Sequence, residues 1–208
     1  MNVLTTIMSK PVNGRQAAAE AQFKELGQTA LDAGANRVNV SRVISGQNIG
    51  QLQLRVFSED LGHAGKISGA MWSSDTAARS RDDENPPGEL VGLIRSNIIY
   101  RALSTPTDEP VMGTVLGLQP HPGKGPQLEQ RLADWADLWA EGGAMQSFVT
   151  SAITGTNGPA LFLTSVYSDW NSWAAASAHA RGSELMRSLR ESSDSAATVM
   201  ANIQLATL

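Results

Sequence analysis

Hydrophobic and polar residues alternate along two neighbouring stretches in the first half of the chain. Residues Arg37 to Ser45 and Gln51 to Phe57 each place aliphatic side chains at every second position over most of their length. This period of two is typical of a strand with one face buried. The sequence Gly-Gln-Asn-Ile-Gly between them has turn composition, so the pattern predicts an antiparallel hairpin.

Other patterns surround this hairpin. Apolar residues at helical spacing predict a helix over 15–33, and the Ala-rich stretch 61–81 favours a second helix. Short apolar segments at 3–10 and 89–103 predict strands at either end. The first half therefore has the predicted order β-α-β-β-α-β.

The hairpin has a counterpart exactly 109 residues later, at Gly143 to Asp169. Nine of these 27 positions are identical without a gap: Gly34/Gly143, Ala35/Ala144, Val40/Val149, Ile44/Ile153, Gly46/Gly155, Asn48/Asn157, Leu52/Leu161, Leu54/Leu163 and Asp60/Asp169. Around this counterpart the patterns predict a strand at 111–118, a helix at 127–141, a hairpin at 145–167, a helix at 169–190 and a strand at 197–208. A period this long indicates a duplicated domain. We expect repeats at 1–104 and 111–208, joined by a linker at 105–110.

A β-α-β-β-α-β unit of about a hundred residues is the ferredoxin-like arrangement, whose two helices cover one face of the sheet. The other face needs cover, and a tandem copy can supply it. The chain resembles the dimeric α+β barrel superfamily. The predicted fold is α+β, with two tandem ferredoxin-like βαββαβ repeats forming a barrel within one chain.

One stretch carries a more specific resemblance. Residues Tyr167 to Leu185 are similar to the strand-end-to-helix segment of antibiotic-biosynthesis-type monooxygenase domains, and Asp169 and His179 match the acidic residue and the histidine of that segment. The first half keeps Asp60 but has Ala70 in place of the histidine. The resemblance implies that the two halves do not share a site equally.

Charge and composition narrow the partners. The 208 residues include 16 Lys and Arg, 20 Asp and Glu, and no Cys, for a net charge of −4 without a basic stripe. Nucleic acid and anionic membrane are therefore not expected as partners. The short N-terminus has no basic segment before its apolar residues, which favours a cytoplasmic protein. The three histidines have no metal-ligand spacing, so no metal or other cofactor is expected; a homodimer is compatible with the resemblance.

The strand alternation also predicts which side chains face the barrel interior. The leucines of each hairpin are expected under the helices, and the opposite face is expected to line the interior: Gln53, Arg55, Phe57, Phe162, Thr164 and Val166. Either these residues surround a pocket for a small apolar or aromatic molecule, or they fill the barrel. The candidate substrate-binding residues are Arg55, Phe57, Phe162, Trp72 and Trp173. The alternative for the tryptophans is core packing.

His179 is the candidate catalytic residue. An imidazole suits proton transfer near neutral pH, and it also suits an axial ligand of haem iron. The alternative is a surface histidine. The leading hypothesis is a small-molecule-binding barrel, either a simple binder or a cofactor-independent monooxygenase- or isomerase-like enzyme. The alternatives are a haem-binding protein using His179 and a non-catalytic structural or oligomerising protein.

Overall fold

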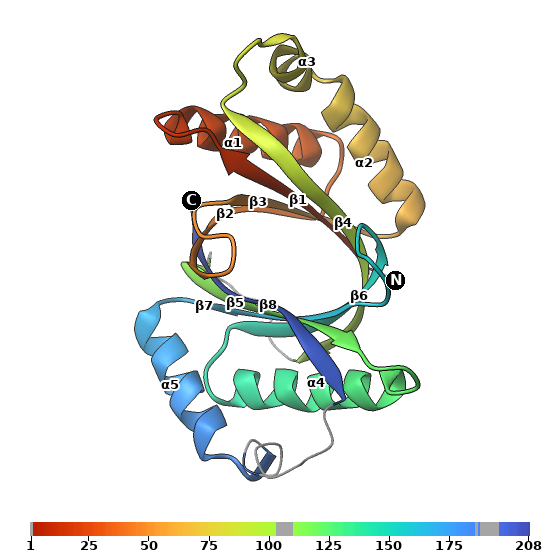
Figure 1. The fold of residues 1–208 in the computed structure, drawn as a ribbon, viewed down its shortest axis with the longest axis vertical. Coiled ribbons are helices and arrows are strands. Elements are labelled where there is room, and N and C mark those ends of the chain that lie inside the picture. The colour runs from red at the N-terminus through yellow and green to blue at the C-terminus, as the bar shows by residue number, and fades with distance from the viewer. Residues whose placement is uncertain (1, 103–109, 186, 188–195) are drawn as a thin grey trace.

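The computed structural model describes residues 2–102, 110–185, 187 and 196–208. Within these residues the strands form one closed antiparallel barrel in the order β1-β3-β2-β8-β5-β7-β6-β4 (Figure 1). The strands are β1 (Asn2–Pro11), β2 (Arg37–Gly46), β3 (Leu52–Ser58), β4 (Gly88–Ala102), β5 (Met112–Pro120), β6 (Gln146–Thr154), β7 (Leu161–Tyr167) and β8 (Ala197–Thr207). The helices are α1 (Gln16–Asp32), α2 (Leu61–Ser73), α3 (Asp75–Asp82), α4 (Gly125–Glu141) and α5 (Trp170–Gly182).

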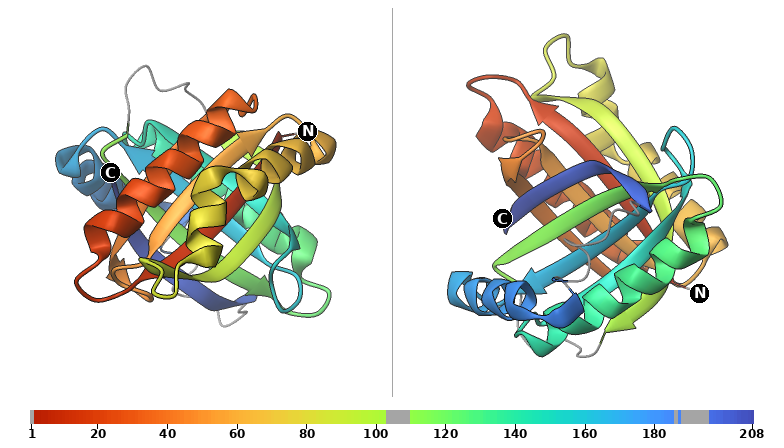
Figure 2. Two further views of the ribbon diagram at one scale, coloured as in Figure 1. Left: turned by 90° about the horizontal axis from the view of Figure 1, so that it is seen from above. Right: turned by 60° about the horizontal axis from the view of Figure 1, so that its bottom comes forward.

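The two halves of the chain contribute adjacent arcs of the barrel. Strands β4, β1, β3 and β2 form one arc, and β8, β5, β7 and β6 form the other in the matching order. The arcs join at two seams, where β2 pairs with β8 and β4 pairs with β6. Helices α1, α2 and α3 cover the first arc and α4 and α5 cover the second, on opposite sides of the barrel (Figures 1 and 2). The predicted α+β barrel of two ferredoxin-like units is confirmed.

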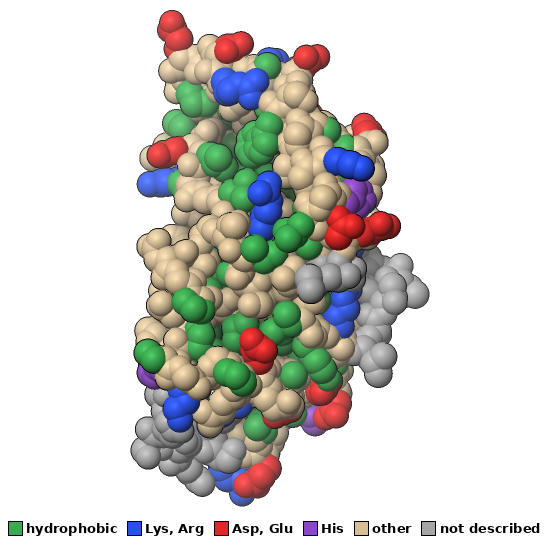
Figure 3. Space-filling view, turned by 90° about the vertical axis from the view of Figure 1, so that its right-hand side faces the viewer, with side chains coloured by type: hydrophobic (Ala, Val, Ile, Leu, Met, Phe, Trp, Pro, Cys, Tyr) green, Lys and Arg blue, Asp and Glu red, His purple; other side chains and the backbone are tan. Residues whose placement is uncertain are grey.

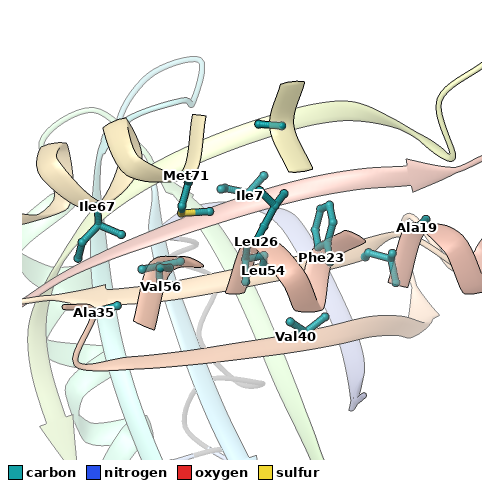
Figure 4. Packing of buried hydrophobic residues seen from close by; sticks show 13 residues of the cluster. Ile7, Ala19, Phe23, Leu26, Ala35, Val40, Leu54, Val56, Ile67 and Met71 are labelled. Carbon is teal, nitrogen blue, oxygen red and sulfur yellow. The ribbon is translucent and has the colours of Figure 1, made fainter. Parts of the chain in front are cut away.

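A cluster of aliphatic and aromatic residues fixes each helical layer to its strands. Leu52, Leu54 and Val56 of β3 belong to one cluster with Phe23 and Leu26 of α1 (Figure 4). Leu161 and Leu163 of β7 pack in the same way with residues of α4. Burial of one such side chain contributes about 1.5–3 kcal/mol, so this face sets the register of each hairpin. The opposite face is left to line the interior.

The structure differs from the predicted elements after β3. The predicted helix 61–81 is two helices, because Ser74 has extended backbone angles (φ −69°, ψ 155°) and caps α3 by accepting a hydrogen bond from the Ala77 N–H at 3.2 Å. Helix α5 ends at Gly182, and the rest of its predicted range includes positions outside the described residues. Residues 105–109 of the predicted linker also lie outside them, so the domain boundaries stay a prediction.

The surface in Figure 3 carries basic and acidic side chains interspersed, without a large field of one sign. In the described part of the chain, no helix is long and apolar enough to cross a membrane.

Asp60 and Asp169, identical in the two repeats, cap α2 and α5. Asp60 accepts a hydrogen bond from the His63 N–H at 2.8 Å and Asp169 accepts one from the Ser172 N–H at 2.7 Å. These bonds are the largest cause of the lowered pKa of both carboxyls in the folded protein. The stabilisation by each cap is therefore present above the pKa that the carboxyl has in the unfolded chain, and it is lost as the pH falls through the lower pKa of the folded state.

We therefore expect Asp60→Ala to lower the thermal midpoint at neutral pH, and the difference from wild type to shrink as the pH falls below the ordinary carboxyl pKa of 3.8. Asp60→Asn is the control, because its amide oxygen still accepts the hydrogen bond. Thermal unfolding followed by circular dichroism at neutral and acidic pH measures both. An equal difference at the two pH values would contradict a charged cap.

Candidate functional site

The barrel is hollow at one end. Neighbouring strands are all antiparallel, and β3 and β7 lie four places apart in the ring, so these two strands run in the same direction. Because each hairpin turn directly precedes one of them, both turns lie at the same end of the barrel. A cavity of about 350 Å³ lies inside this end, and the turns form its rim. The rim residues are Gln47, Asn48, Gly155, Thr156 and Asn157; the polar wall residues are Thr6, Gln53, Arg55, Ser96, Thr150 and Thr164; the apolar ones are Leu4, Met8, Ile94, Val115, Phe162, Met200, Ala201 and Ile203.

Among the described residues, the cavity wall has one charged residue, Arg55 on β3. Its side chain is directed inward because Leu54 and Val56, on either side of it, face the helices. Arg55 is only 6% exposed. Its Nη2 donates a hydrogen bond to Gln53 Oε1 at 3.1 Å, and its Nε has no hydrogen-bond partner among the described residues.

Burial lowers the pKa of Arg55 to about 10. Desolvation disfavours the charged form, but this pKa is still well above neutrality, so the guanidinium is protonated at pH 7. No Asp or Glu is among the described residues that line the cavity. The cavity therefore contains a positive charge without a counter-ion from its own wall.

The other half of the chain contributes an apolar group to the wall, together with the polar Thr150 and Thr164. Phe162 packs against a cluster formed by Val43, Val115, Ile203 and Leu205, from β2, β5 and β8. At the fixed offset of 109, Phe162 takes the place of Gln53 and Thr164 takes the place of Arg55. The duplicated strands thus differ at the cavity, because β3 contributes Gln53 and Arg55 where β7 contributes Phe162 and Thr164.

Two aromatic side chains meet toward the other end of the barrel. The rings of Phe57 on β3 and Phe148 on β6 meet edge to face, with centroids 6.0 Å apart and an interplanar angle of 73°. They come from different halves, and neither is among the described residues that line the cavity. The described cavity therefore lies at the hairpin end, and this aromatic pair lies outside its lining.

The structure places the predicted binding residues in different environments. Arg55 and Phe162 line the cavity together, whereas Phe57 is inside the barrel but packs on Phe148. Trp72 lies on α2, outside the barrel, and packs against the cluster beneath that helix. Trp173 lies on α5, also outside, in a cluster with Met112, Ala144, Tyr167 and Ala176.

His179 lies on the outer surface of α5. Its side chain is 47% exposed, and its Nε2 is 3.9 Å from Glu141 Oε2. In the described part of the chain, no His, Asp, Glu or Lys lines the barrel cavity. A catalytic role for His179 stays a prediction that its position does not support. The haem alternative is not favoured either, since His179 does not face the cavity.

A second cavity, of about 400 Å³, lies between the helices and strands of the second half. Trp135, Trp139 and Trp173 line it from α4 and α5. At the same places the first half has Leu26, Ala30 and Ala64, which are buried. None of the residues lining it within the described ranges is of a type that holds haem iron, namely His, Cys, Met or Tyr.

Sequence reasoning identified Gln53, Arg55 and Thr164 but missed the other half of the polar wall and the rim. Thr6, Ser96 and Thr150 come from strands whose interior face was not assigned, and Asn48 and Asn157 from the two turns. The identity of Asn48 and Asn157 at the fixed offset was a signal for the rim. The strand register explains the position of Thr6, because this residue lies directly across from Arg55 on the neighbouring strand.

Comparison with known proteins supports the fold. No known protein family and no curated protein sequence matches the chain. Among solved structures, a candidate monooxygenase from Fusobacterium nucleatum aligns over 100% of this chain and 92% of its own, with a TM-score of 0.70 and 10% identity. An anthrone oxidase-like protein aligns over 99% and 91%, with a TM-score of 0.62 and 12% identity. A chlorite dismutase variant from Candidatus Nitrospira defluvii aligns over 100% and 90%, with a TM-score of 0.57 and 8% identity.

At these identities the likeness is one of fold. The chain has the dimeric α+β barrel fold, closed within one polypeptide, with a cavity of mixed polar and apolar lining at the hairpin end.

Proposed function

We propose that this protein binds a small, largely apolar or aromatic molecule inside the barrel, at the hairpin end. The observation that carries the proposal is the cavity of about 350 Å³, whose size falls in the range of about 300–1,000 Å³ usual for small-molecule sites. A barrel with a purely structural role has no need of such a space, because an unfilled apolar interior costs stability.

The distribution of side chains supports this kind of ligand. Phe162, Ile203 and Met200 offer an apolar surface, and a few polar groups from both halves line the same cavity. A pocket that is mostly apolar with a few placed polar groups is the usual composition of a ligand site. Asn48 and Asn157 on the rim are exposed, which gives the molecule a route from solvent between the two turns.

A second candidate is cofactor-independent oxygenation of such a molecule. Its support is that similarly folded proteins are described as a candidate monooxygenase and as anthrone oxidase-like. The described wall has no carboxylate, imidazole or amine to act as a general base, so the substrate would have to ionise readily by itself. Simple binding requires no such condition and is the function the geometry supports best.

Filling the cavity tests the proposal. We expect Ala201→Phe on β8 to weaken binding of the neutral probe 2-naphthamide by at least about tenfold, because the new ring occupies the space of the ligand. Ala206→Phe is the matched control, since it lies on the same strand with its side chain on the other face from that of Leu205. Isothermal titration calorimetry measures affinity, and circular dichroism checks folding.

If 2-naphthamide does not bind the wild-type protein, or if both variants lose binding equally, the barrel cavity is not the binding site. Native mass spectrometry of the freshly purified protein provides an independent check, because a retained small molecule should be displaced in Ala201→Phe.

A further inference from the structure

We propose that the molecule held in the barrel is a monoanion, with one carboxylate or phenolate bound by Arg55 and an apolar or aromatic body. This inference rests on the proposed function and adds to it the chemical class of the ligand.

The first argument is the contrast between Arg55 and three arginines that have a carboxylate partner. Arg15, Arg42 and Arg79 each form an ion pair with a carboxylate near the surface, where water would solvate them in any case. Arg55 is far more buried than these. Among the described residues its one side-chain hydrogen bond is to the neutral Gln53.

The second argument is the cost of that arrangement. A buried charge without a partner is strongly unfavourable, and cores ordinarily replace it with an apolar side chain. Residues that break a stability rule without local compensation are expected at functional sites. An anionic ligand supplies the missing counter-charge.

The third argument is geometry. Arg55 lines the cavity, and its planar guanidinium can hold the two oxygens of a carboxylate side by side. Thr6 lies directly across from Arg55 on β1 and also lines the cavity, so its hydroxyl can donate to the same oxyanion.

The fourth argument limits the charge and sets the orientation. Arg55 is the cationic residue of the described cavity wall, so the site neutralises one negative charge and does not suit a phosphate or a dicarboxylate. Phe162 and Ile203 come from the opposite half. The oxyanion is therefore directed toward β3, and the apolar body lies against β7 and β8.

Two pairs of measurements test this inference. Calorimetry at pH 7.5 compares 2-naphthoate with the neutral 2-naphthamide, which has nearly the same shape. We expect the wild-type protein to prefer naphthoate by about tenfold to a hundredfold, the usual effect of a hydrogen-bonded charge. Arg55→Leu should lose this preference but still bind naphthamide. Arg95→Leu is the matched control, since Arg95 is a partly buried arginine whose Nη2 donates to Ser68 of α2, outside the cavity.

The second pair of measurements separates the two kinds of oxyanion. 2-Naphthol is titrated by the absorption of its phenolate form, free and bound. A lower pKa when bound to the wild-type protein, but not to Arg55→Leu, identifies a phenolate site, and a preference for naphthoate identifies a carboxylate site. Either result supports the inference.

The inference is overturned if naphthoate and naphthamide bind the wild-type protein equally and the pKa of bound naphthol is unchanged. It is also overturned if Arg55→Leu keeps the preference. If no probe binds any variant, the proposed function itself fails, which is a different result from equal binding of both probes.

Discussion

Arg55→Met is expected to make the protein more stable, although it removes the residue that we place at the centre of the site. The variant exchanges a buried cation without a counter-ion for an apolar side chain of similar length. Replacement of buried charges by apolar residues of similar volume can stabilise by about 1–4 kcal/mol. For a chain of this length, a gain of about 2 kcal/mol raises the thermal midpoint by roughly 4–8 °C.

The pH dependence of this gain follows from the lowered pKa of Arg55. Because that pKa is about 10 in the folded protein and higher in the unfolded chain, the cost of burying the charge is fully present below pH 10. It falls as the pH rises above 10, where the folded-state guanidinium loses its proton. The advantage of Arg55→Met should therefore be full at neutral pH and smaller above pH 10.

Differential scanning calorimetry of the wild type, Arg55→Met and Arg95→Met measures the effect. Arg95→Met should gain less stability, since Arg95 also donates one side-chain hydrogen bond but is only partly buried, so its charge costs less in the folded protein. Saturating 2-naphthoate should raise the midpoint of the wild type by more than that of Arg55→Met. A clear loss of stability in Arg55→Met would show that Arg55 is stabilised by contacts other than a ligand.

The sequence was sufficient to predict the architecture because the hairpins carry their own register. The alternation around Leu52, Leu54 and Val56 left one choice for the buried face, and a one-residue slip would have exposed all three. The same alternation at Leu161 and Leu163 then predicted a second sheet with the same arrangement of strands. The same alternation correctly directed Arg55 and Phe162 into the barrel.

The helices gave no such constraint, and the predictions there differ more from the structure. Helix α5 is rich in alanine, so its pattern does not show which face packs on the strands. In the structure Ala176 and Ala180 are buried, and His179 is left in solvent near Glu141. Which end of the barrel is hollow depends on Phe57 and Phe148, whose contact joins two halves of the chain and has no local signature.

The two glycines that begin the hairpin turns, Gly46 and Gly155, are expected to tolerate no side chain. Both have positive φ, of 86° and 89°. A Cβ at Gly46 would lie against the backbone carbonyl of Asn202 on β8, and one at Gly155 against that of Leu93 on β4. These are backbone contacts at the two seams that close the barrel, so no side-chain rearrangement can relieve them.

We expect Gly46→Ala and Gly155→Ala each to destabilise the protein by more than about 4 kcal/mol, with a fall of roughly 10 °C or more in the thermal midpoint. Gly50→Ala is the matched control in the same hairpin. Gly50 has φ of 87°, and a methyl group added there would meet nothing within 4 Å, so this variant carries only the backbone strain of about 1–2 kcal/mol.

The comparison within one hairpin separates backbone strain from barrel closure. If Gly46→Ala and Gly50→Ala lower the free energy of unfolding by the same amount, the close backbone contact at the seam does not add to the cost of Gly46→Ala. A larger cost at Gly46, together with loss of 2-naphthamide binding at temperatures where the variant is still folded, shows that the seam also shapes the rim of the cavity. The identity of Gly46 and Gly155 in the two repeats then has a physical reason, since each half must approach the last strand of the other half closely enough to close one ring.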